Sequence, residues 1–228
     1  MVAGYTAAQV RAAEKPHLDR GEPLMRMAAA ALAAVVREQL ARSADATPSV
    51  LVLAGSGDNG GDALFAAAEL AGDGARVEVV PTGPRLHAEA RAAAERSGVR
   101  ILGEVDPAQI ARLAAGASVI VDGILGTGTS ADPALRGRAR ELVVGVLPVL
   151  AAADRPIVVA VDLPSGIHPD DGSVPDRAVL AADVTVTFGA AKAGLLLEPG
   201  ADYAGELRVI DLGLGAELDR FTPLVERG

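Results

Sequence analysis

Short, mostly apolar runs with little alternation recur along this chain, and segments with helical periodicity separate them. Such runs are typical of strands that are buried on both faces of a parallel sheet. The predicted strands are, in chain order, residues 50–54, 76–81, 99–102, 118–122, 156–162, 183–188 and 207–210. The pattern therefore predicts an α/β fold, with helices on both faces of a mostly parallel central sheet.

The predicted helices are residues 6–20, 23–42, 61–72, 84–97, 107–115 and 134–152. Thr6 followed by Gln9 is a capping box, and Pro107 is suited to the first turn of a helix. Residues 213–228 are weakly patterned, so we expect a frayed tail there. Because no linker or internal repeat divides the chain, residues 1–228 are predicted to form a single domain.

Composition excludes several classes of protein. The net charge is −9 and no basic cluster stands out, which argues against binding to nucleic acid or to an anionic membrane. The chain has no cysteine, so disulfides, thiolate metal sites and cysteine nucleophiles are excluded. The start lacks the pattern of a signal peptide, and no apolar run approaches the roughly 20 residues of a membrane span. A cytoplasmic protein is expected.

Three predicted strands end in polar, glycine-containing loops, at residues 57–62, 122–132 and 162–166. In a parallel sheet the carboxyl ends of all strands lie at one edge, where open α/β sheets bind ligands. The three loops are therefore expected to converge on one site. Capping and turn formation are the simpler explanation for each acidic or hydroxyl residue taken singly.

The first loop, Asp58-Asn59-Gly60-Gly61-Asp62, lies between a strand and a helix. Free N–H groups at a helix N-terminus favour phosphate or pyrophosphate. The spacing is neither G-x-G-x-x-G nor that of a P-loop, and it contains two acids. Acids repel phosphate unless they hold a cation or a sugar hydroxyl.

The oxygen donors on these loops favour a hard cation. An amide, a single carboxylate and a hydroxyl suit a monovalent ion better than Mg²⁺ or Zn²⁺. His17, His87 and His168 are scattered along the chain, and we expect them at the surface rather than acting as bases. Lys192 follows a strand and could reach a phosphate, orient a loop or be solvated.

Five segments together resemble the NAD(P)H-hydrate epimerase family over about residues 5–214. They are Tyr5-Thr-Ala-Ala-Gln-Val-Arg, Asp58-Asn-Gly-Gly-Asp62, Asp122-Gly-Ile-Leu-Gly-Thr-Gly, Val161-Asp-Leu-Pro-Ser-Gly166 and Thr185-Val-Thr-Phe-Gly-Ala-Ala-Lys-Ala-Gly194. The resemblance implies a Rossmann-like three-layer sandwich and a homodimer. It also implies a potassium-dependent enzyme that interconverts the R and S epimers of hydrated NADH and NADPH.

Carried over residue by residue, the resemblance implies potassium ligands at Asn59, Asp122 and Ser165. It places hydrated NADH or NADPH against a larger set: Asp58, Asn59, Gly60, Gly61, Asp62, Gly126, Thr127, Gly128, Thr129, Ser130, Ala131, Asp132 and Asp162. Two positions depart from the family pattern, because Asp58 replaces an Asn and no glycine follows Gly128 in residues 129–133. Many bacterial members continue into a dehydratase domain, which implies such a domain or partner for the reaction product.

Epimerisation needs an acid–base residue that protonates the leaving hydroxyl and then activates water. Asp162 is the predicted residue, because ligation of a metal keeps Asp122 ionised. An inactive protein- or nucleotide-binding module on the same fold is the alternative. An NAD-dependent dehydrogenase is disfavoured, since the glycine spacing is wrong and strand 76–81 has no acid at its end.

Overall fold

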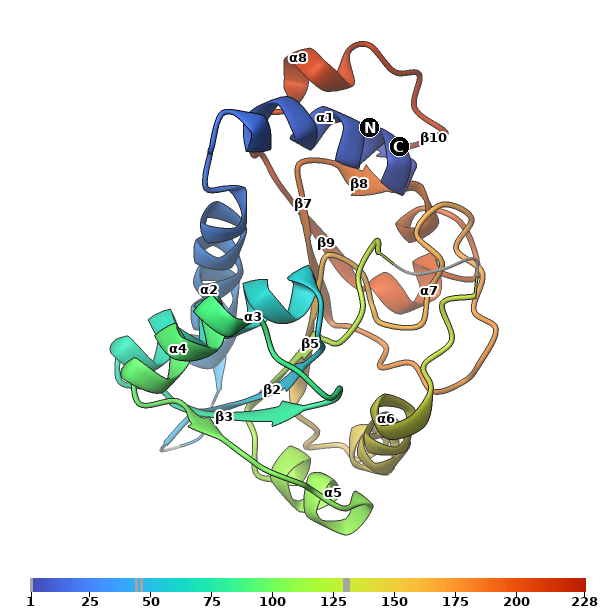
Figure 1. Ribbon diagram of the computed structural model, residues 1–228. Coiled ribbons are helices and arrows are strands. Elements are labelled where there is room, and N and C mark those ends of the chain that lie inside the picture. Colours follow the sequence, from blue (N-terminus) through green and yellow to red (C-terminus); the bar gives the residue numbers. More distant parts are fainter. Residues whose placement is uncertain (1, 44, 46, 129–131) are drawn as a thin grey trace.

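The computed structural model describes residues 2–43, 45, 47–128 and 132–228, and its centre is a seven-stranded parallel sheet (Figure 1). The strand order is β4-β3-β2-β5-β6-β7-β9, and every neighbouring pair is parallel. The strands are β2 (Ser49–Ala54), β3 (Arg76–Pro81), β4 (Arg100–Ile101), β5 (Val119–Gly123), β6 (Ile157–Val161), β7 (Val184–Phe188) and β9 (Glu206–Ile210). The predicted α/β fold with a mostly parallel central sheet is confirmed.

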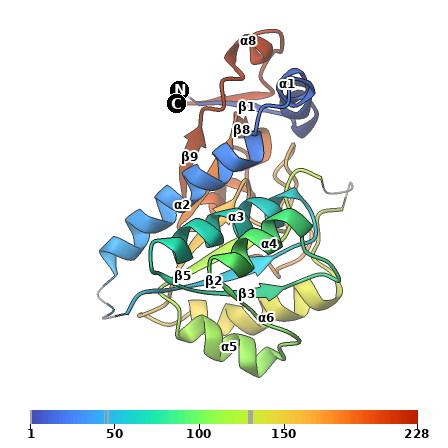
Figure 2. The same ribbon diagram turned by 60° about the vertical axis from the view of Figure 1, so that its left-hand side comes forward.

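Helices cover both faces of this sheet (Figure 2). One face packs against α2 (Leu24–Arg42), α3 (Asp58–Gly72) and α4 (Ala88–Arg96), and the other against α5 (Pro107–Ala115) and α6 (Gly137–Leu150). Alternate residues of β2 separate accordingly, with Val50 and Val52 in the first apolar cluster and Leu51 and Leu53 in the second. The uninterrupted apolar runs thus reflect burial on both faces.

The order of the strands creates a crevice at one edge of the sheet. From β2 the chain runs outward through α3, β3, α4 and β4, and then returns through α5 to β5 on the other side of β2. Connections on either side of the β2–β5 pair therefore cover opposite faces. Open α/β sheets bind ligands at such a switch point, beyond the carboxyl ends of the strands.

A second sheet of three strands joins the two ends of the chain. It contains β1 (Val2–Tyr5), β8 (Ala191–Lys192) and β10 (Val225–Arg227), in the order β10-β1-β8. The frayed tail predicted for residues 213–228 is corrected, because this segment contains α8 (Gly215–Leu218) and the paired strand β10. Three-residue strands carry too little pattern to be recognised in a sequence.

Other boundaries differ slightly from the prediction. Helix α3 begins at Asp58 rather than near residue 61, so the glycine-rich loop forms its first turn. The remaining elements are the helix α1 (Ala7–Asp19), the 3₁₀ turn η1 (Ala193–Leu195) and the short helix α7 (Ala201–Ala204). None of the helices formed by the described residues combines the length and apolar character that a membrane span needs.

Candidate functional site

The first turn of α3 presents backbone donors at the crevice that have no partner within the helix. Gly57, the residue before the helix, is extended and has no side chain to cap it. The first backbone hydrogen bond of the helix runs from Gly61 N to Gly57 O over 3.1 Å, so the N–H groups of residues 58–60 have no partner within the helix. Together with the positive end of the helix dipole, these groups favour an anion.

These donors border a pocket of about 370 Å³. Residues 55–59 form one wall and residues 124–128 the opposite wall, with Thr82 and Gly83 after β3 closing a third side. Two of the three predicted loops therefore line one cavity at the switch point. Asp58, Asn59, Gly126, Thr127 and Gly128 lie together here, as expected of residues that bind one ligand.

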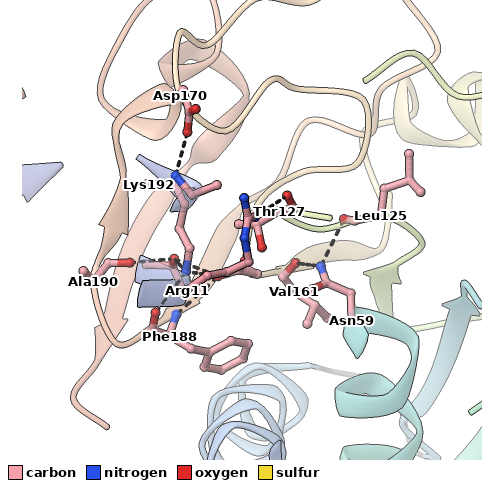
Figure 3. A network of polar contacts seen from close by, with 12 residues as sticks. Arg11, Asn59, Leu125, Thr127, Val161, Asp170, Phe188, Ala190 and Lys192 are labelled. Carbon is pink, nitrogen blue, oxygen red and sulfur yellow. Dashed lines mark hydrogen bonds and ion pairs between the residues drawn. The ribbon is translucent and has the colours of Figure 1, made fainter. Parts of the chain in front are cut away.

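Asn59 holds the crevice together with its carboxamide (Figure 3). Its Nδ2 donates to Leu125 O at 3.0 Å and to Val161 O at 2.6 Å, linking the loop after β5 to the last residue of β6. A Cβ at Gly126 would collide with this carboxamide, so glycine is required there. The amide oxygen, Oδ1, lies on the side of Gly126.

Asp122 and Ser165 meet beneath Asn59, although 43 residues separate them. Ser165 Oγ donates to Asp122 Oδ1 at 2.6 Å, and Ser165 N donates to Asp122 Oδ2 at 2.9 Å. Asp122 is fully buried. Burial raises the pKa of Asp122, and the hydrogen bonds from Ser165 oppose that rise.

No basic side chain pairs with Asp122 in the part of the chain that the structure describes. A buried carboxylate without a cationic partner is costly, so a bound cation would stabilise it. Carboxylate, hydroxyl and carbonyl oxygens from Asp122, Ser165 and Leu125 lie at this point, and Asn59 reaches the same carbonyl through its Nδ2. Such a set of hard donors with a single carboxylate fits a monovalent cation such as potassium. Among the described residues, no group of three His, Asp or Glu side chains is arranged to hold a metal ion.

Asp162 follows the adjacent strand β6 and has a different environment. Its backbone is left-handed, with φ 68°, which is strained for an aspartate. The carboxylate forms a buried ion pair with Lys192 and accepts a hydrogen bond from Thr187 Oγ1 at 3.1 Å. Lys192 is 2% exposed, so the solvated alternative for this residue is wrong.

Asp62 points from α3 toward α1 and lines a smaller pocket of about 140 Å³ with Glu14, Asp58 and Phe188. Its Oδ1 is buried and has no hydrogen-bond partner among the described residues. Burial raises the pKa of Asp62 well above its usual range, and the charges of Asp162 and Asp58 add to that effect. Burial also raises the pKa of Glu14, although the Lys192 charge opposes it.

Helix α1 covers the site and contributes residues that the sequence analysis did not assign to it. Arg11 Nη1 donates to Thr127 O at 2.9 Å (Figure 3). Ala7 N donates to Asp170 Oδ1 at 2.6 Å. These bonds join the N-terminal helix to the loops after β5 and β6. Two signals were available, the family-like segment of residues 5–11, which ends at Arg11, and the spacing of Arg11 and Glu14, which places both on one face of a helix.

The remaining predicted residues do not line this pocket. Gly60 packs against the Gly55 backbone, and Gly61 lies against the Met25 and His87 side chains. Asp132 binds Arg136 and accepts from Ala134 N at 3.0 Å, a hydrogen bond that, with Arg136, lowers its pKa. Thr129, Ser130 and Ala131 lie outside the described residues.

His17 is buried, contrary to the expectation that it lies at the surface. Its Nδ1 lies 2.7 Å from Glu22 Oε2, and its Nε2 lies 3.2 Å from Glu217 Oε2. Hydrogen bonds with these two glutamates raise the pKa of His17. The histidine therefore ties α1 to α8 and lies outside the crevice.

Comparisons with known proteins agree with this geometry. A family model described as YjeF-related protein N-terminus matches residues 21–194. The NAD(P)H-hydrate epimerase of Clavibacter sepedonicus is 53% identical over 223 residues, which cover 97% of this chain and 94% of that protein. The bifunctional NAD(P)H-hydrate repair enzyme Nnr of Thermanaerovibrio acidaminovorans is 33% identical over 225 residues, which cover 95% of this chain and 42% of that protein.

The crystal structure of the yeast protein YNL200c is similar in fold. It matches with a TM-score of 0.77 and covers 100% of this chain and 97% of that chain. Because the sequence identity is 20%, this likeness bears on the fold alone.

Proposed function

The chain belongs to the YjeF-related N-terminal family, and from this we propose that it is an NAD(P)H-hydrate epimerase, an isomerase of nicotinamide nucleotide repair. The observation that carries the proposal is the 53% identity to a curated epimerase over 97% of the chain. The convergence of Asn59, Asp122, Asp162 and Ser165 at one sheet edge agrees with it.

The chemistry of the substrate defines what the site must do. A hydrated nicotinamide ring bears a hydroxyl on the carbon next to the ring nitrogen. When that hydroxyl is protonated it leaves as water, the nitrogen lone pair forms a C=N bond, and the ring becomes a planar cation. Water then adds to either face and loses a proton, which regenerates one epimer or the other.

We assign the two proton transfers to Asp162. As an acid it gives its proton to the departing hydroxyl, and the resulting carboxylate takes a proton from the incoming water. The carboxylate coexists with the cationic ring, so the two charges attract each other. Lys192 and Thr187 both bond the carboxylate and stabilise this ionised form.

The other residues bind and orient the substrate in this proposal. The N–H groups at the start of α3 suit the phosphates, and the walls formed by residues 55–59 and 124–128 suit the rest of the nucleotide. Asn59, Asp122 and Ser165 would hold a potassium ion, whose charge offsets the buried carboxylate. Asp58 adds a negative charge beside the phosphates, which the helix N-terminus and this cation counteract.

Two features of assembly belong to the proposal as well. The resemblance to the epimerase family implies a homodimer, and we propose a homodimer here. The similarity to part of a bifunctional repair enzyme also suggests that a second activity, a dehydratase domain or partner, acts on the epimerised product.

The test is epimerisation itself. Purified S- or R-hydrated NADH is mixed with the protein in potassium buffer, and then in buffer with a bulky organic cation in place of potassium. The epimer ratio is followed by chromatography against the spontaneous rate. We expect acceleration that is strong with potassium and weak without it.

The outcomes separate the enzyme from its alternative. Equal acceleration in both buffers would support the epimerase activity and contradict the proposed potassium site. No acceleration in either buffer, from protein shown to be folded, would favour the inactive binding module.

A further inference from the structure

Lys192 is the largest fully buried side chain of the described residues, and it reaches the candidate acid–base residue. Its ammonium contacts Asp162 Oδ1, donates to Phe188 O at 2.9 Å and donates to Thr187 Oγ1 at 3.2 Å. An ammonium has three protons, and all three have acceptors here. The group is therefore fixed in place and has no donor left for the substrate.

The hydrogen bonds to Asp162 all fall on one of its two oxygens. Oδ1 accepts from Lys192 Nζ, from Thr187 Oγ1 at 3.1 Å and from Phe188 N at 3.4 Å. No residue in the described ranges donates a hydrogen bond to Oδ2. One oxygen is anchored by the protein, and the other is available for proton exchange.

The backbone around this pair supports the same arrangement. Asp162 N donates to Val186 O at 2.8 Å, which holds the left-handed residue against β7. Lys192 lies in β8, and β8 pairs with β1 through the Tyr5–Lys192 register. The small sheet that joins the chain ends therefore positions the lysine next to the Asp162 carboxylate.

We propose that Lys192 is a positioning residue for epimerisation, which anchors Oδ1 of Asp162 so that Oδ2 alone exchanges protons with the hydroxyl and the water. This inference rests on the proposed function and deepens it. The lysine acts through Asp162 and does not touch the substrate. Thr187 has the same role with a smaller effect, because it supplies one neutral hydrogen bond.

A purely structural ion pair would have different consequences. Its loss would lower stability, and any change in activity would follow the fraction of folded protein. A positioning role lowers kcat in the folded protein and leaves KM nearly unchanged, because substrate contacts are intact. The split between kcat and KM therefore separates the two explanations.

The experiment compares Lys192→Met with Lys15→Met, the matched control. Lys15 is the other lysine of the chain, and it is exposed on α1 in a salt bridge with Asp19. We expect Lys192→Met to lower kcat by about 100-fold or more with KM changed by less than about threefold, and Lys15→Met to change neither. A folded Lys192→Met protein with kcat within about threefold of wild type would overturn the proposal.

Thr187→Val covers the case in which Lys192→Met does not fold. Valine matches threonine in shape but has no hydroxyl, and the ammonium remains. We expect about a 10-fold loss of kcat with KM unchanged. An unchanged kcat in this folded variant would contradict the proposal.

A crystal structure of Lys192→Met, or of Thr187→Val if the first is not folded, makes the test independent of activity. We expect the Asp162 carboxylate to leave its Oδ1-anchored orientation in Lys192→Met, and to shift by a smaller amount in Thr187→Val, where the ammonium remains. A carboxylate that stays in place would overturn the positioning role, whatever the activity. Absence of epimerisation by wild-type protein would count against the proposed function, and the carboxylate orientation would still test the positioning role.

Discussion

Asp122 and Asp162 lie at the ends of adjacent strands, are both buried, and have opposite kinds of partner. Asp122 accepts hydrogen bonds from neutral groups, the hydroxyl and amide of Ser165 and the amide of Ile124. Asp162 is paired with the ammonium of Lys192. The free-energy cost of burying a charge is therefore offset in different ways for the two carboxylates.

This difference indicates a division of labour. A buried carboxylate with neutral partners retains an unmet need for positive charge, which a cation can supply. A carboxylate with its own ammonium has no such need, and one of its oxygens is free for proton transfer. Two aspartates with the same place in their strands can thus serve as a metal ligand and as an acid–base residue.

The largest expected effect is on catalysis by Asp162→Asn. The amide cannot exchange a proton with the hydroxyl, so we expect epimerisation to fall by about 10²–10⁴-fold. Chromatographic assay of the epimer ratio measures this loss. Activity within a few-fold of wild type in folded protein would remove Asp162 from the role.

The stability of the same variant tests whether Asp162 depends on its ion pair with Lys192. The free energy of unfolding is expected to fall by about 3–5 kcal/mol, because Lys192 is left buried without a charged partner. Denaturant unfolding measures the loss. The double variant Asp162→Asn/Lys192→Met should recover much of that stability without recovering activity, and a single variant as stable as wild type would show that the pair contributes little.

The next largest effect concerns potassium. We expect potassium to raise the melting temperature of the wild-type protein and of Asp162→Asn, because ligand binding stabilises the folded state. Asp122→Asn should lose this response, with at least about a 10-fold weaker apparent affinity, because the carboxylate charge is gone. Thermal melts across a potassium series check both variants. Equal responses in the two variants would contradict the proposal that Asp122, and not Asp162, binds potassium.

Asp62 extends the comparison to a buried carboxyl for which the described residues provide neither a cation nor a hydrogen bond at Oδ1. Burial raises its pKa, so the folded state keeps a proton that the unfolded state releases above about pH 4. Stability contributed by the neutral acid is therefore lost as pH rises from that value toward the folded-state pKa. Asparagine cannot ionise, so Asp62→Asn does not lose this stability. The resulting difference in the free energy of unfolding is about 1.4 kcal/mol for each unit by which burial raises the pKa of Asp62.

Denaturant unfolding between pH 4 and 8 measures this effect. We expect the stability of Asp62→Asn relative to wild type to increase with pH across this range. The exposed Asp73→Asn provides a control with little expected change. A relative stability that does not vary with pH would mean that Asp62 is ionised in the folded protein.

The smallest effect is expected for Ser165→Ala. Removal of the hydroxyl leaves Asp122 and Leu125 N each without one hydrogen bond, at a cost of about 1–3 kcal/mol. We also expect a potassium affinity between those of wild type and Asp122→Asn. Thermal melts with and without potassium measure both quantities, and an affinity equal to wild type would exclude the Ser165 hydroxyl as a ligand.

Much of the fold could be predicted from local pattern. Apolar runs such as residues 50–54 and 118–122 identified buried parallel strands, and Thr6 with Gln9 identified a helix start that the structure confirms as a capping box. The short strands β1, β8 and β10 could not be predicted. They exist because distant segments pair, and their two to four residues have no periodicity of their own.

The same limit on prediction from local sequence applies to the candidate site. The amino-acid sequence was enough to predict the parallel sheet, and therefore which loops meet at one edge, because strand direction follows from buried apolar runs joined by helices. It also determined which oxygen-bearing residues those loops carry. The burial of Lys192 against Asp162, and the contact of Asp122 with Ser165, are visible only in the folded chain. Both contacts depend on which distant side chains share a low-dielectric interior, where each charge must find a partner across dozens of residues of chain.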